Sequence, residues 1–135
     1  MPVRPKKGLG QHFLRDENIA RKIVQSLDAE KTGSILEIGP GTGILTGYLL
    51  ENYPGLYIIE LDEEAWTYLG ERFPLQEGRA VHGDFLKTDL LDRITPPVSI
   101  IGNFPYNISS QIFFRILECR QKVEQVICMI QKEVA

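Results

Sequence analysis

Cysteine and histidine are scarce in this sequence, with two residues of each kind among 135. Cys119 and Cys128 lie in separate apolar runs, which is typical of buried thiols and not of a disulfide framework or a metal-binding pair. His12 and His82 are too few to form a catalytic zinc site, which takes about three protein ligands. The sequence therefore predicts no metal site and no disulfide-stabilised secreted fold.

Long hydrophobic runs are missing as well. No segment approaches the roughly 20 consecutive apolar residues of a membrane-spanning helix, and the basic N-terminus lacks the apolar stretch of a signal peptide. With 43% apolar and 24% charged residues, the composition is that of one globular domain with a hydrophobic core. We therefore expect a cytoplasmic protein with no membrane partner.

Excess positive charge, which nucleic-acid-binding domains usually carry, is absent from the chain as a whole. The net charge is −3 and the pI is near 5.4. The distribution is uneven, because the first 22 residues have a net charge of +4 and the rest therefore −7. A basic N-terminal arm at residues 1–16 could contact phosphates locally, although a disordered, solubilising tail has the same composition.

What the sequence does contain is an alternation of strand-like and helix-like segments. We expect strands at residues 34–38, 56–60, 79–82, 98–101 and 126–130. We expect helices at residues 18–27 and 44–51, at 63–73 after an Asp62 cap, and around 112–117 after a cap at Ser109 or Ser110. This alternation predicts an α/β fold, a mostly parallel sheet with helices on both faces. Ligands of such sheets bind beyond the carboxyl ends of the strands.

A glycine-rich turn follows the first predicted strand. Gly39, Gly41 and Gly43 form a G-x-G-x-G pattern that opens a helix. Glycine lets the backbone turn sharply and approach a ligand closely, although a tight turn alone would also require it. The dinucleotide fingerprint G-x-G-x-x-G would need glycine in place of Ile44, which disfavours a dinucleotide-dependent oxidoreductase.

Carboxylates follow the second and third predicted strands. Glu60 can accept hydrogen bonds from both ribose hydroxyls of an adenosine ligand, whereas Asp62 is better placed to cap a helix. Asp84 can accept a hydrogen bond from an adenine amino group, and Phe85 can pack on the ring. An aspartate-initiated turn at Asp84, or a merely exposed Glu60, is the structural alternative.

The most specific pattern, Asn103-Phe104-Pro105-Tyr106, follows the fourth predicted strand, which we expect to end at residues 102–103. The Asn103 side-chain oxygen and the Phe104 carbonyl can accept both hydrogens of an exocyclic amine, which frees the nitrogen lone pair for methylation. Pro105 fixes the direction of that carbonyl. Tyr106 offers a stacking face for a base taken out of its stack. A Pro-Tyr turn with a packed aromatic ring is the structural alternative.

These motifs together resemble the class I S-adenosylmethionine-dependent methyltransferases that act on rRNA adenines, in particular the bacterial small-subunit rRNA adenine dimethyltransferases. The resemblance covers essentially the whole chain. Its specific parts are KGLGQHFL at 7–14 and GNFPYNIS at 102–109, and it includes LEIGPGTG at 36–43, IELD at 59–62, GD at 83–84 and QKEVA at 131–135.

The resemblance implies a Rossmann-like fold and S-adenosylmethionine as cofactor. Together with the loop and ring arguments above, it assigns cofactor binding to His12, Leu14, Gly39, Gly41, Glu60, Asp84, Phe85 and Asn103. It assigns catalysis to Asn103, Phe104, Pro105 and Tyr106. The implied activity is dimethylation of two adjacent adenosines near the 3′ end of small-subunit rRNA, in a pre-ribosomal particle.

The family's catalytic domain continues past the fifth strand, and a helical domain follows it. The resemblance therefore implies that residues 1–135 are a partial catalytic domain, truncated after the fifth strand and without the C-terminal helical domain. We expect such a piece to be inactive on RNA and to self-associate through its exposed fifth strand.

Two alternatives remain open. A large-subunit rRNA adenine methyltransferase of the macrolide-resistance type shares most of these motifs, although such enzymes tend to be strongly basic. A non-catalytic RNA-binding assembly factor could retain the fold, but the intact motif at 103–106 disfavours it.

Overall fold

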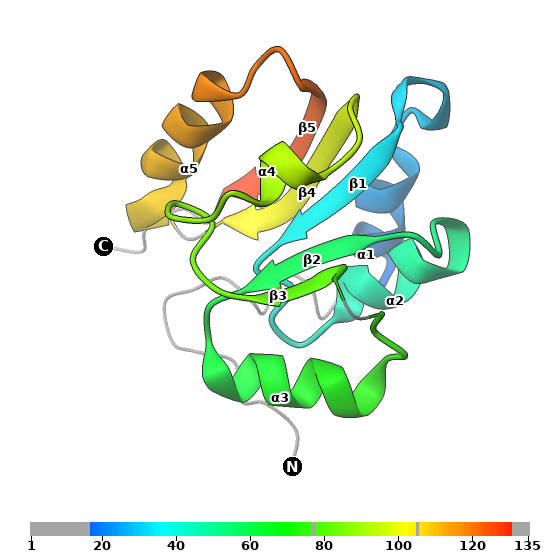
Figure 1. Ribbon diagram of the computed structural model, residues 1–135. Helices are drawn as coiled ribbons and strands as arrows, with labels where there is room; N and C mark the ends of the chain where they lie inside the picture. Colours follow the sequence, from blue (N-terminus) through cyan, green and yellow to red (C-terminus); the bar gives the residue numbers. More distant parts are fainter. Residues whose placement is uncertain (1–16, 77, 105, 131–135) are drawn as a thin grey trace.

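A five-stranded sheet forms the centre of the protein (Figure 1), in a computed structural model that describes residues 17–76, 78–104 and 106–130. The strands are β1 (Ser34–Ile38), β2 (Tyr57–Glu60), β3 (Ala80–His82), β4 (Val98–Phe104) and β5 (Val123–Ile130). The helices are α1 (Glu17–Gln25), α2 (Ile44–Asn52), α3 (Glu63–Arg72), α4 (Leu90–Arg93) and α5 (Tyr106–Glu118), with a short 3-10 helix η2 (Ala29–Lys31).

The strands are arranged in the order β3-β2-β1-β4-β5, and every neighbouring pair is parallel. The chain therefore proceeds outward from β1 through β2 to β3, then crosses back to place β4 on the other side of β1. Such a reversal opens a crevice at the carboxyl ends of β1 and β4, where parallel sheets bind their ligands. The predicted mostly parallel α/β fold is confirmed.

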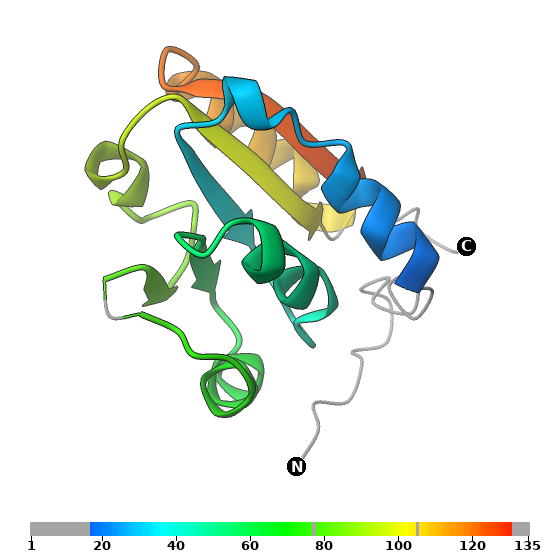
Figure 2. The same cartoon turned by 90° about the vertical axis from the view of Figure 1, so that its right-hand side faces the viewer.

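Helices cover both faces of the sheet, because successive side chains of each buried strand point to opposite faces. One apolar cluster joins Ile35, Ile58 and Ile101 of the sheet to α1, α2 and α3. A second cluster joins Leu36 and Ile100 to α4 and α5 on the other face. Figure 2 shows α1 in front of the sheet and α5 behind it.

Helix α3 begins at the position that the sequence predicts. Asp62 has an extended backbone and its Oδ2 accepts a hydrogen bond from the Ala65 N–H at 2.9 Å, so the predicted helix cap is confirmed. In contrast, α2 begins after Gly43, whose φ of 83° is left-handed and whose position supplies no side-chain cap.

The segment around β4 and α5 differs from the prediction. β4 continues to Phe104 because Asn103 and Phe104 pair with Met129 and Ile130 of a β5 that is also longer than predicted. α5 begins at Tyr106, so Ser109 lies buried within the helix, and the predicted cap at 109 or 110 is wrong. The short elements η2 and α4 were not predicted, because three or four residues cannot display a helical periodicity.

Three further expectations concern composition. Cys119 and Cys128 are free thiols but only half-buried, so full burial was wrong. No helix in the described part of the chain is long and apolar enough to cross a membrane. Within residues 17–76, 78–104 and 106–130, no three His, Cys, Asp or Glu side chains are placed to share a metal ion.

Candidate functional site

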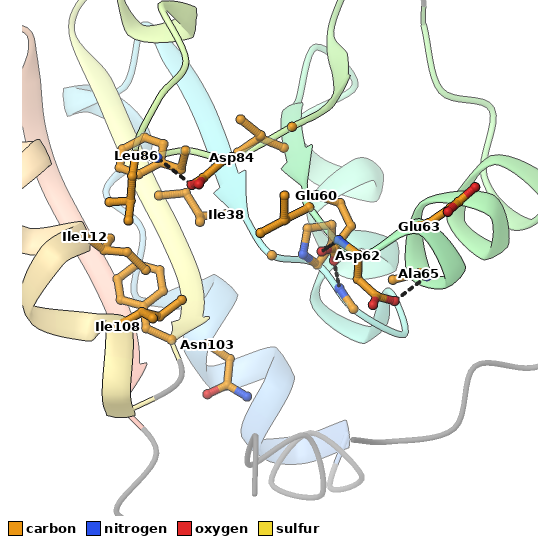
Figure 3. Close-up of a pocket in the computed structure, with 18 of the residues that line it drawn as sticks. Ile38, Glu60, Asp62, Glu63, Ala65, Asp84, Leu86, Asn103, Ile108 and Ile112 are labelled. Carbon is orange, nitrogen blue, oxygen red and sulfur yellow. Dashed lines mark hydrogen bonds between the residues drawn. The ribbon is translucent and has the colours of Figure 1, made fainter. Parts of the chain in front are cut away.

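A cavity of about 480 Å³ opens at the carboxyl ends of the strands (Figure 3). Its wall includes residues that follow β1, β2 and β3, the end of β4, and the first turns of α5. The volume lies within the roughly 300–1,000 Å³ typical of small-molecule sites. The cavity thus occupies the place that the sheet topology predicts for a ligand.

The three glycines after β1 have different structural roles. Gly39 and Gly41 line the cavity with left-handed φ values of 65° and 59°, and a Cβ added at Gly39 would meet no atom within 4 Å. A Cβ added at Gly43 would instead lie 2.5 Å from Cε2 of Phe73 and 3.1 Å from Leu69. The first two glycines therefore shape the cavity wall, and the third permits close packing of α2 against α3.

Glu60 ends β2 and is only 7% exposed, with its carboxylate at the cavity wall. Its Oε1 accepts a hydrogen bond from the Gly41 N–H at 2.8 Å, and its Oε2 accepts one from the Asp62 N–H at 3.0 Å. A carboxylate offers about four acceptor sites, so two of them stay available to hydroxyl groups of a ligand. Glu60 thus holds the glycine loop in place as well as facing the cavity.

Asp84 and Phe85 reach the same cavity from the loop after β3. The Asp84 Oδ1 accepts a hydrogen bond from the Leu86 N–H at 2.9 Å, which is the aspartate turn named above as the structural alternative. The second carboxylate oxygen is left for a ligand. Phe85 is buried in the apolar cluster under the cavity, so only part of its side chain can contact a bound ring.

The motif at 103–106 supplies the opposite side of the cavity. Asn103 and Phe104 both line it (Figure 3 labels Asn103), but the Phe104 side chain is 1% exposed and packs edge-to-face on Phe113 at 5.8 Å. Phe104 can therefore offer its backbone and not its ring. Pro105 lies outside the described residues, and Tyr106 begins α5 with its side chain outside the described part.

Other predicted positions are not covered. His12, Leu14 and the basic arm at 1–16 lie outside the described residues. Conversely, several lining residues had no assigned role: Leu61, Asn107, Ile108 and Ile112. Asn107 and Ile108 lie inside the motif at 102–109, and Ile112 follows Ile108 by one helical turn. A prediction that α5 begins at residue 106 would therefore have placed these three side chains near the cavity.

Glu37 is the second acid beneath the glycine loop, and the sequence reasoning gave it no role. Its side chain is 1% exposed, and the Thr46 hydroxyl of α2 donates a hydrogen bond to its Oε1. Burial raises the pKa of Glu37 to about 8; the bond from Thr46 opposes this rise, and the negative charge of Glu60 adds to it. The neutral acid therefore predominates at pH 7.

A sequence model of the family described as "Ribosomal RNA adenine dimethylase" matches residues 3–135. Two curated relatives, both named "Ribosomal RNA small subunit methyltransferase A", come from Parabacteroides distasonis and Cytophaga hutchinsonii. They are 50% and 47% identical over 98% of this chain, but only 50% and 52% of their own lengths are matched. The chain thus spans about half the length of the curated relatives it matches.

Solved structures of methyltransferases also match this chain. The 23S rRNA methyltransferase ErmE superimposes with a TM-score of 0.68 and 27% identity, covering 83% of this chain and 45% of that one. A dimethyladenosine transferase from Plasmodium falciparum gives a TM-score of 0.64 and 30% identity, covering 85% and 42%. The S-adenosylmethionine-bound amino pentose methyltransferase CalS10 from Micromonospora echinaspora, at 18% identity and a TM-score of 0.58, shares the fold. The Rossmann-like methyltransferase fold is therefore shown.

Proposed function

The chain belongs to the ribosomal RNA adenine dimethylase family, and we propose that it forms the cofactor-binding part of a small-subunit rRNA adenine dimethyltransferase. The observation that carries this proposal is the convergence of Gly39, Glu60, Asp84 and Asn103 on one cavity, each from the carboxyl end of a different strand. In this proposal residues 1–135 are part of the catalytic domain, with residues 1–16 as a basic arm, and the relatives' remaining half completes the protein.

The residues at the cavity fit S-adenosylmethionine, which when bound supplies an electrophilic methyl group on a sulfonium. The left-handed backbone at Gly39 leaves open space where any other residue would place a Cβ. Glu60 has acceptor sites left for ribose hydroxyls, and Asp84 has a free oxygen for an adenine amino group. His12 and Leu14 complete the proposed cofactor contacts.

The chain's part in methyl transfer is to position the amine. Asn103 lies one residue before the end of β4, and both Asn103 and Phe104 line the cavity, which supports a role for the Asn103 side chain and the Phe104 carbonyl there. These two oxygens would accept the two amine hydrogens and aim the nitrogen lone pair at the donor, a contribution of orientation. Pro105 and Tyr106 would set the turn and stack on the target base. This chemistry requires no metal.

The proposed substrate is small-subunit rRNA, two adjacent adenosines near its 3′ end within a cytoplasmic pre-ribosomal particle. The names of curated relatives at 47–50% identity support this choice. The large-subunit alternative is supported by the structural match to ErmE, but only at 27% identity. A non-catalytic assembly factor is disfavoured because Asn103 keeps its place at the cavity.

Calorimetric titration of the 135-residue chain with S-adenosylmethionine and, separately, with NAD tests the cofactor assignment. We expect binding of the first and none of the second. Tight NAD binding would reject the proposal. For the substrate, a protein extended to the length of its relatives should methylate small-subunit particles and not naked large-subunit rRNA; the reverse preference would favour the large-subunit alternative.

A further inference from the structure

Glu37 lies beneath the cavity without lining it. It precedes the last residue of β1, two positions before Gly39, and its buried side chain points to the α2 side of the sheet, where Thr46 donates to it. Its neighbours in register are Ile58 on β2 and Ile101 on β4. An acid that is enclosed in apolar surroundings and bound to one hydroxyl is poorly placed to carry a charge.

Few charges in the described part of the chain act on Glu37. α2 faces it with the uncharged Thr46, and the flanking strand residues Ile58 and Ile101 are apolar. The charged group that influences it is Glu60, whose carboxylate accepts hydrogen bonds from the Gly41 and Asp62 N–H groups. Glu37 lies two residues before Gly39 and Glu60 is bonded to Gly41, so both acids adjoin the glycine loop that lines the cavity.

We propose that Glu37 is a proton-linked positioning residue, neutral in the ligand-free protein and ionised when a cationic ligand occupies the cavity. The inference rests on the proposed function, because S-adenosylmethionine carries a sulfonium, an ammonium and one carboxylate, and so has a net charge of +1. A ligand of net charge +1 in the cavity offsets the repulsion between these two acids, which favours ionisation of the second acid. The proton leaves Glu37 for the solvent, and no other bond changes.

Thermodynamic linkage between proton binding at Glu37 and ligand binding determines how ligand affinity changes with pH. Because burial raises the pKa of Glu37 to about 8 without ligand, the neutral acid predominates at pH 7. If bound ligand lowers that pKa, binding releases protons, and affinity rises with pH until pH exceeds the ligand-free pKa. Each unit of decrease corresponds to a rise in affinity of about tenfold across that window.

The same linkage distinguishes the methyl donor from its demethylated product. S-Adenosylhomocysteine has a neutral thioether in place of the sulfonium, so it should lower the pKa of Glu37 less than S-adenosylmethionine does. The ratio of the two affinities should therefore shift toward the methyl donor as pH rises from 6.5 to 8.5. Glu37 would thereby help the protein release product and take up a new donor.

Calorimetry of the 135-residue chain in phosphate, HEPES and Tris buffers at pH 7.0 counts the protons released when S-adenosylmethionine binds. For a fall of one pKa unit we expect Glu37 to contribute on the order of 0.4 proton. Glu37→Gln preserves an oxygen that can accept from Thr46 but cannot ionise, so this contribution should vanish. The exposed Glu51→Gln on α2 is the matched control and should release as many protons as the unmodified chain. The cofactor's own amino group titrates equally in all three proteins and cancels in the comparison.

Thr46→Val provides an independent measurement if Glu37→Gln fails to fold. Loss of the hydroxyl removes the donor that stabilises the carboxylate, so the rise in affinity should move to higher pH. Equal proton release by the unmodified chain and Glu37→Gln, or an unshifted pH profile for Thr46→Val, would overturn the inference while leaving the proposed function intact. Absence of any S-adenosylmethionine binding would reject both.

Discussion

The carboxylate of Glu60 has two partners in the protein and, in our proposal, two more in the cofactor. Glu60→Ala should weaken S-adenosylmethionine binding by roughly 1–3 kcal/mol, because ligand hydroxyls lose a charged acceptor. It should also loosen the glycine loop, since the Gly41 N–H loses its acceptor. Glu60→Gln retains one acceptor oxygen and should lose less affinity. Calorimetric affinities of the three proteins test this; unchanged affinity in the alanine variant would show that Glu60 is only structural.

A second residue-scale prediction concerns stability and pH. The pKa of Glu37 in the folded protein is raised from the ordinary 4.5 to about 8, so between these values the folded state binds a proton that the unfolded state has lost. The contribution of Glu37 to the free energy of unfolding should therefore fall, by on the order of 1 kcal/mol per pH unit, as pH rises through this window, with no further loss above it. Glu37→Gln should lack this slope. Urea unfolding of both proteins at pH 6, 7, 8 and 9 is the test, and parallel curves would contradict it.

A third prediction concerns the role of Asn103 in methyl transfer. In a protein extended to the relatives' length, Asn103→Ala should nearly abolish methyl transfer through kcat, because the amine loses the acceptor that orients it. Asn107→Ala makes the same chemical change on α5 in the same cavity and should be milder. Radiolabelled methyl transfer to small-subunit particles, with circular dichroism as a check of folding, measures both. Activity of Asn103→Ala within a few-fold of the unmodified protein would refute the role.

Residue type and position after a strand were enough to predict that Glu60, Asp84 and Asn103 would meet, since parallel strands bring their carboxyl ends to one edge. The same reasoning did not predict the burial of Glu37. A glutamate within a strand pattern gives no sign of its burial, which arises only when α2 brings Thr46 over it. Local sequence therefore locates the cavity wall, and long-range packing determines the electrostatics behind it.

At the scale of elements, α2 and α3 are joined through Gly43. Gly43→Ala would place a Cβ 2.5 Å from a ring carbon of Phe73 in a backbone whose φ is 83°, so we expect a loss of about 1–3 kcal/mol in the free energy of unfolding. Gly70→Ala is the matched control, because this helical glycine has open space around its Cα. It should be neutral or stabilise by up to about 1 kcal/mol. Thermal unfolding compares them; equal effects would contradict the packing argument.

Long, periodic elements were predictable and their ends were not. α1, α2 and α3 agree with the sequence pattern to within one or two residues, because each has an apolar face or a clear first residue. β4 was predicted three residues too short, since Asn103 looked like a strand terminator. The residues of β5 that extend it, Met129 and Ile130, lie 26 positions further along the chain than their partners, and no local pattern predicts that pairing.

At the scale of the whole molecule, the described part of the chain has an unpaired sheet edge. β5 pairs with β4 alone among the described strands, and its residues 123 and 126–129 are apolar yet only half-buried. Phe114 and Leu117, on the nearby α5, are 66% and 55% exposed. Open apolar edges pair readily with other chains, so the chain should self-associate as its concentration rises.

Light scattering across a dilution series measures this self-association. Met129→Lys, which places a charge on β5, should shift the equilibrium toward monomer. A single 15.3 kDa species at high concentration would refute the edge argument. The same preparations should bind S-adenosylmethionine but transfer no methyl group to small-subunit particles, because the 135 residues match only about half the length of their relatives.

The crossover from β3 back to β4 also has a temporal consequence. A ribosome releases this chain from its N-terminus, so β1, β2 and β3, with Gly39, Glu60 and Asp84, leave the exit tunnel before β4 does. The part of the cavity wall that these three residues form can therefore assemble first, while the other edge of β1 stays open. Arrival of β4 at that edge adds Asn103 and closes the wall that would face the target amine. In our proposal, the side of the site that would hold the methyl donor therefore precedes, in biosynthetic order, the side that would hold the acceptor.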